Sequence, residues 1–161
     1  MSDGNITRWV FASLAKYVKG VATGLSLPAI VFGVEEPNDN YGKATDRVEI
    51  RITGLSTREP TAGYTQVSVD CTVVLHSMLG DTKNRYQVMT YEAAFAEALD
   101  MDIAVYKYGV FSGDDDSFVG CLIPMTGRNE GVRILQFGSL PNVRATQSAV
   151  GVRYRMEVQD V

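Results

Sequence analysis

Histidine, cysteine and long apolar stretches are scarce in this sequence. Its single histidine, His76, leaves little material for general acid–base catalysis near neutral pH. His76 lies on the polar side of an alternating segment, so we expect it to be exposed or at a sheet edge. No stretch approaches the roughly 20 apolar residues of a membrane helix, and the polar start Met1–Asn5 differs from a signal peptide. We therefore expect no membrane partner and a cytoplasmic origin.

Motifs for metals, cofactors and nucleophilic catalysis are missing as well. Cys71 and Cys121 lie far apart in apolar segments, which favours two buried free thiols, although a disulfide between them stays open. The densest carboxylate cluster, Asp114–Asp116, lacks the spacing of a calcium loop and is interpreted as a solvated turn. No phosphate-binding glycine motif or nucleophile elbow is present. We predict no metal site, no cofactor and no catalytic residues, and hence a protein that is not an enzyme.

The composition is that of one globular domain. The 161 residues are 45% hydrophobic and 21% charged, enough for two packed layers of secondary structure, and no linker or repeat divides residues 1–161. Fifteen basic residues against 19 acidic ones give a formal charge of −4. That balance argues against a protein that grips nucleic acid, but it suits one that lets DNA pass without specific binding.

Two segments have the three- and four-residue apolar spacing of amphipathic helices, residues 6–21 and 85–100. Asn5 is expected to cap the first helix, and Asn84 with a glutamine three residues later resembles a capping box for the second. Acidic residues after the second helix oppose the helix dipole, so its C-terminal end should be frayed or bonded to a neighbouring element.

Strict alternation of apolar and polar side chains predicts strands at 48–53, 66–76 and 150–159, and shorter apolar runs predict strands at 29–34, 103–110, 118–123 and 132–137. The polar connections 35–46 and 113–117 are predicted loops, and the link 54–63 is long enough to predict a projecting loop. The expected fold class is α+β, with an antiparallel or mixed β-sheet packed against an N-terminal helix and a central helix.

The order of these elements resembles the tail terminator proteins of tailed bacteriophages, also called tail completion or neck proteins. The resemblance rests on the amphipathic N-terminal helix, the central helix Tyr86–Leu99 and the amphipathic final strand Val152–Val158. It implies a homohexameric ring in the virion tail or neck that caps the tail tube protein and joins it to the head-tail connector protein, with DNA passing through the lumen.

Charged residues on strands and loops are the candidate contacts with neighbouring subunits or partners. Arg51, Arg153 and Arg155 alternate outward and can pair with carboxylates of a neighbour, and the acidic turn Asp114, Asp115 and Asp116 projects between two strands. Other phage connectors or tail tube subunits remain alternatives. So do a small-ligand or single-stranded nucleic-acid binding module that uses Tyr106 and Tyr108, and an enzyme that uses Asp114–Asp116 with a divalent cation.

Overall fold

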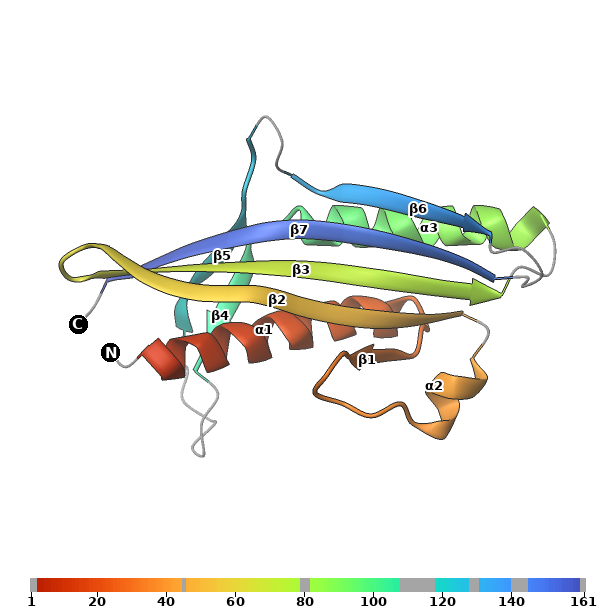
Figure 1. Cartoon of the computed structure of the whole chain (residues 1–161), viewed down its shortest axis with the longest axis horizontal. Helices are drawn as coiled ribbons and strands as arrows, with labels where there is room; N and C mark the ends of the chain where they lie inside the picture. Colours follow the sequence, from red (N-terminus) through yellow and green to blue (C-terminus); the bar gives the residue numbers. More distant parts are fainter. Residues whose placement is uncertain are drawn as a thin grey trace.

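A computed structural model of the chain describes residues 3–44, 46–78, 82–107, 118–127, 131–139 and 145–159 (Figure 1). Its elements, in chain order, are α1 Asp3–Gly24, β1 Ala29–Val31, α2 Asp39–Lys43, β2 Asp46–Thr61, β3 Tyr64–Met78, α3 Thr82–Leu99, β4 Ile103–Tyr106, β5 Phe118–Pro124, β6 Arg133–Ser139 and β7 Ala145–Gln159. The turn predicted at 112–116, with Asp114–Asp116, and Tyr108 lie outside the described residues.

The strands form one mixed sheet in the order β1-β2-β3-β7-β5-β4, with β6 pairing the first half of β7. β1 runs parallel to β2 and the other pairs are antiparallel. Figure 1 shows α1 running along β2 and α3 running along β6 and β7. Because both helices pack into the same core cluster, they cover one face of the sheet. The predicted α+β class, with a sheet against an N-terminal and a central helix, is confirmed.

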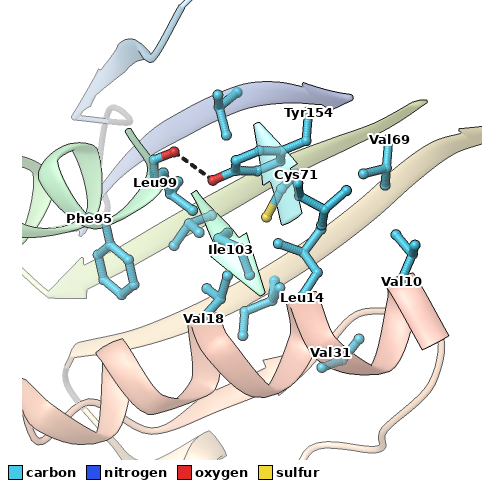
Figure 2. Packing of buried hydrophobic residues seen from close by; sticks show 14 of the residues in the cluster. Val10, Leu14, Val18, Val31, Val69, Cys71, Phe95, Leu99, Ile103 and Tyr154 are labelled. Carbon is cyan, nitrogen blue, oxygen red and sulfur yellow. Dashed lines mark hydrogen bonds between the residues drawn. The ribbon is translucent and has the colours of Figure 1, made fainter. Parts of the chain in front are cut away.

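The core consists of the apolar set of each alternating strand and one stripe of each helix. Val67, Val69, Cys71 and Val73 of β3 are fully buried, as are their cross-strand neighbours Ile50 and Val150. Figure 2 shows Val10, Leu14 and Val18 of α1 facing this strand set. Removing such side chains from water is the main favourable term in folding, so the two-residue period fixes which face is inside.

Two tyrosines hold the C-terminal end of α3. The hydroxyl of Tyr154 on β7 donates to the carbonyl oxygen of Leu99 at 2.6 Å (Figure 2), and the hydroxyl of Tyr17 on α1 donates to that of Ala98 at 2.7 Å. The last turn of α3 contains no basic residue. These hydroxyls therefore satisfy carbonyls that the helix leaves free, and this end is bonded to neighbouring elements.

Several predicted boundaries are wrong. The first helix begins at Asp3, so Asn5 lies within it, and the second begins at Thr82, so Asn84 is not a cap. Both first turns consist of polar residues in the sequence, so apolar periodicity gives no signal for them. The first short strand ends at Val31, where the amides of Val34 and Glu35 turn back onto its carbonyl.

The predicted loop 54–63 is also wrong, because β2 continues to Thr61 and turns into β3 at residues 62–63. The predicted loop 35–46 contains α2, whose first turn is capped by the Asn38 side chain at 2.7 Å from the Tyr41 amide. His76 is half-buried on the central strand β3, not exposed or at an edge. Cys71 and Cys121 are free thiols; Cys71 is fully buried, and Cys121 is half-buried.

Replacing Tyr154 with Phe should lower the free energy of unfolding by about 1–3 kcal/mol, because the buried Leu99 carbonyl loses its donor. Urea denaturation followed by circular dichroism measures this difference. Tyr64→Phe is the matched control: Tyr64 is 45% exposed, and removal of its hydroxyl should change the free energy of unfolding by less than about 0.5 kcal/mol. Equal losses in both variants would show that the Tyr154–Leu99 bond contributes nothing specific.

Candidate interaction surface on the open face of the sheet

We call the sheet face opposite α1 and α3 the outer face. In antiparallel pairs, directly opposed residues share a face, so the register assigns it without ambiguity. One row across the sheet joins Arg51, Thr72, Gly151 and Arg133. The next row joins Thr53, Asp70 and Arg153. Arg51, Arg153 and Arg155 therefore lie on one face, although β2 and β7 are far apart in the sequence.

The outer face has the opposite charge balance to the whole chain. The described parts of β2, β3, β6 and β7 present six arginines and three carboxylates there, whereas the chain has a formal charge of −4. These residues are Arg47, Arg51, Arg58, Arg133, Arg153, Arg155, Glu49, Asp70 and Glu157. An excess of positive charge on one face favours contact with acidic groups on a partner.

Asp70 orients the guanidinium of Arg153. The Nε and Nη2 atoms of Arg153 donate to the two carboxylate oxygens of Asp70 at 2.9 and 3.4 Å. Gly54 on β2 makes room for this carboxylate, because a Cβ there would lie 2.6 Å from Asp70 Oδ2. Gly54 also has φ +63°, in the left-handed region that glycine tolerates best. The backbone conformation therefore favours glycine at this position, and any larger residue would also displace the Asp70 carboxylate.

Arg51 is held from two sides. Its Nε donates to Glu49 Oε1 at 3.1 Å, and its guanidinium lies 4.9 Å from the centroid of the Phe32 ring. Glu49 is only 9% exposed, and its second carboxylate oxygen lies 3.4 Å from His76 Nε2. Arg51 is thus fixed in position by contacts within its own subunit, with its side chain 43% exposed.

The turn that carries Phe32 is tied to α1 by Glu35. Lys19 Nζ lies 2.5 Å from Glu35 Oε1, and the other carboxylate oxygen accepts from the Val31 amide at 3.0 Å. The hydrogen bond from Lys19 and then that from Val31 lower the pKa of Glu35. The ionised carboxylate therefore holds the turn in the position that brings Phe32 against Arg51.

Arg155 belongs to a polar chain where β3 and β7 pair at the far end of the sheet. Its Nη2 donates to Glu157 Oε1 at 3.2 Å, and Gln66 Nε2 donates to the same oxygen at 3.2 Å. Arg58 in turn donates to Gln66 Oε1. The Nε of Arg155 is buried without a hydrogen-bond partner among the described residues. Arg51, Arg153 and Arg155 all have a carboxylate partner within the chain, which sequence reasoning missed.

The end of the β2–β3 hairpin that carries the turn, residues 54–64, projects from the sheet, and we call it the arm. None of its residues is buried, and only Leu55 and Thr57 are half-buried. In the described part of the chain, β1 pairs with β2 only as far as Ile50, so the arm has an open edge. Figure 1 shows the hairpin reaching past α1 at the end of the sheet near both termini. The arm and the open edge were missed because a segment that is wet on both faces has no apolar alternation.

A hollow of about 600 Å³ lies on the outer face where β3, β7 and β6 meet. Thr72, Ala149 and Gly151 line it with small groups, while Arg133, Arg153 and Leu135 line it with long ones. The available sequence signal was Gly151, an isolated glycine inside a strand pattern, which often marks a place where something approaches closely.

The aromatic residues near β4 are packed among themselves. The Tyr106 and Phe118 rings meet edge to face at 6.0 Å between centroids, and Lys107 Nζ lies 5.5 Å from the Trp9 ring centroid. Tyr106 remains 41% exposed and Phe118 54% exposed. Of the two residues predicted to form a nucleic-acid stacking surface, Tyr106 is described and contacts Phe118, which the prediction did not include, and Tyr108 lies outside the described residues.

The described residues contain no group of three or more His, Cys, Asp or Glu side chains placed to hold a metal ion. Within the same residues, no helix is both long and apolar enough to cross a membrane. The sequence matches no model of a known protein family and shows no significant similarity to a curated protein. The arginine-rich outer face, its hollow and the arm together form the candidate functional surface.

Replacing Gly54 with Ala should destabilise the protein through backbone strain of about 1–2 kcal/mol and through displacement of the Asp70 carboxylate. Gly63→Ala is the control, because φ is +86° there and no heavy atom lies within 4 Å of the added Cβ. Urea denaturation should give a smaller penalty for Gly54→Ala in an Asp70→Ala background, with the Gly63→Ala penalty unchanged. An unchanged Gly54→Ala penalty would refute the close approach.

Glu35→Gln should remove a stabilising contribution of at most about 1 kcal/mol, since the pair with Lys19 is over a third exposed. Because folding lowers the pKa of Glu35, the contribution is fully present above the ordinary glutamate pKa of about 4.3 and is lost as the pH falls through the lower folded pKa. Unfolding measured from neutral to acidic pH should show the wild-type advantage shrinking to zero in acid. Glu36→Gln is the exposed control and should leave the stability at neutral pH unchanged.

Proposed function

We propose that this protein is a structural tail assembly protein of a tailed bacteriophage, the tail terminator. In this role it forms a ring of identical subunits. The ring caps the tail tube protein and joins it to the head-tail connector protein. DNA passes through the ring without specific binding. The protein acts by contact and not by turnover, and its place is the tail or neck of the virion.

The observation that carries the proposal is a sheet whose two long helices, α1 and α3, both pack on the inner face. On the outer face, β2 and β7 present oriented arginines, and the β2–β3 hairpin continues into an arm. Subunit contacts need broad, polar-rimmed surfaces with groups fixed before contact, since ordering flexible side chains costs free energy. The outer face, with arginines held in position by contacts within the subunit, meets that requirement.

The subunit also has two different open edges, which suits a head-to-tail contact. The arm edge of β2 and the outer edge of β6 lack a strand partner among the described residues. A contact between two different surfaces repeats around a ring if the rotation closes and extends into a filament if it does not. The same feature thus supports a tube subunit as the alternative within this class.

Arg51, Arg153, Arg155 and Asp114–Asp116 are the proposed contact residues. Each of the three arginines already forms an ion pair within its own subunit. A carboxylate of a neighbouring subunit would therefore bind an arginine that keeps its first partner and would extend this ion pair. A module that binds a small ligand or single-stranded nucleic acid is the candidate from another class, favoured by the exposed Tyr106–Phe118 pair.

Light scattering over a wide concentration range, with negative-stain images, tests the proposed function. We expect a closed ring of about six chains, because closure is what a capping role requires. Open filaments would contradict the terminator and favour the tube subunit. A monomer at every concentration that binds an oligothymidylate strand would favour the binding module.

Shortening the arm should abolish this assembly. Thr57 and Val67 are cross-strand partners, so the outer part of the arm, together with Thr65 and Gln66 at the start of the buried part of β3, can be replaced by an Asn-Gly turn that closes the hairpin at that pair. We expect the scattering mass to fall to that of one chain while the far-ultraviolet spectrum stays native-like. Glu59→Gln, at an exposed arm position, keeps the length and should assemble normally. Normal assembly of the shortened chain would remove the arm from the interface.

A further inference from the structure

The hollow on the outer face exists because the middle of one sheet row has almost no side chains. Thr72 and Gly151 occupy the two central positions of this row, and Arg51 and Arg133 stand at its two ends. Neighbouring strands lie about 4.8 Å apart, so the two arginine Cα atoms are separated by about 14 Å. The row therefore makes a trough with a small-residue floor between guanidinium groups.

The backbone does not require the glycine in this floor. Gly151 does not adopt a positive φ, and a Cβ there would meet Thr72 Oγ1 at 3.5 Å, which is ordinary van der Waals contact. Glycine inside a strand weakens the strand, because it gains no packing and loses more conformational entropy on folding. Gly54, by contrast, has a positive φ that strains any other residue, and a Cβ there would displace the Asp70 carboxylate. Gly151 thus keeps space open at a cost to the sheet, which makes this space a candidate binding site.

The walls of the hollow define the chemistry of that occupant. Arg153 is oriented by the two-point contact with Asp70 and is still 55% exposed. Arg133 on β6 is the cross-strand partner of Gly151, and it makes no ion pair with another described residue. Leu135 provides an apolar wall that is 56% exposed. Guanidinium groups fit carboxylates with paired hydrogen bonds, and the leucine fits an aliphatic neighbour of the carboxylate.

We propose that the hollow binds an extended acidic segment of a partner protein, with a carboxylate between Arg133 and Arg153 and an apolar side chain against Leu135. This binding site deepens the proposed assembly function. It rests on that function only in one respect, namely that the partner is another subunit of the same particle. A space of about 600 Å³ holds a few side chains. Asp70 inside the hollow and Glu49 in the next row repel a continuous polyanion, so a protein carboxylate is favoured over a DNA backbone.

Fluorescence anisotropy with a labelled peptide of repeating Val-Ser-Asp-Ser, which places valine and aspartate on the same side of an extended chain, tests this proposal on the full protein. We expect saturable binding that weakens with salt, and no binding of the matched peptide with asparagine in place of aspartate. Arg133→Gln should weaken binding of the acidic peptide about tenfold or more, through loss of a charge-assisted contact. Arg47→Gln is the control, because Arg47 lies on the same face but against Tyr41, outside the hollow.

Gly151→Val separates the hollow from the fold. The branched side chain suits a strand and should keep or raise the stability to urea, while it fills the floor and abolishes peptide binding. Equal binding of both peptides, or full binding by Gly151→Val, would overturn the proposal. No binding of the acidic peptide at the highest soluble peptide concentration would also overturn the proposal. If an oligothymidylate strand displaced the peptide more strongly than unlabelled peptide does, the surface would be assigned to nucleic acid instead. Ring formation by wild-type protein without peptide binding would reject the hollow and leave the proposed function standing.

Discussion

The pairing of β3 with β7 is the constraint on which the other features depend. Fifteen consecutive residue pairs join the strands, from Tyr64 opposite Gln159 to Met78 opposite Ala145, without a register shift. A slip by one residue would turn every apolar side chain to the solvent and every polar one into the core. The same register places Asp70 opposite Arg153 and Thr72 opposite Gly151. The core, the oriented arginine and the floor of the hollow are therefore consequences of one ladder.

The outer-face ion pairs have a role in orientation more than in stability. Arg153 is 55% exposed and Arg155 41% exposed, and ion pairs with so much solvent contact contribute little to folding. Their value lies in limiting the rotamers that a guanidinium samples before it meets a partner. The buried Glu49 differs, because a carboxylate that is 9% exposed needs the groups of Arg51 and His76 around it.

Sequence reasoning found the elements that bury one face and missed those that do not. The alternation in 66–76 and 150–159 located β3 and β7, and the apolar spacing in 6–21 located α1, because burial imposes a period on each. The arm has no dry face, so 54–63 gave a loop. For the candidate surface, Arg51, Arg153 and Arg155 were placed correctly on an outward face. Their partners and Arg133 were missed, since pairing across strands depends on a register that one sequence does not reveal.

The position of β7 has a consequence for the order of events during synthesis. β7 lies inside the sheet, between β3 and the strands β5 and β6, yet it comes last in chain order. Until residues 145–159 have left the ribosome, one long edge of β3 has no partner and the Leu99 carbonyl has no tyrosine donor. During this time the edge of β3 is exposed, and an exposed strand edge is prone to aggregation. The nascent chain reaches its stable form only when this strand inserts, which makes chaperone shielding during translation valuable to this fold.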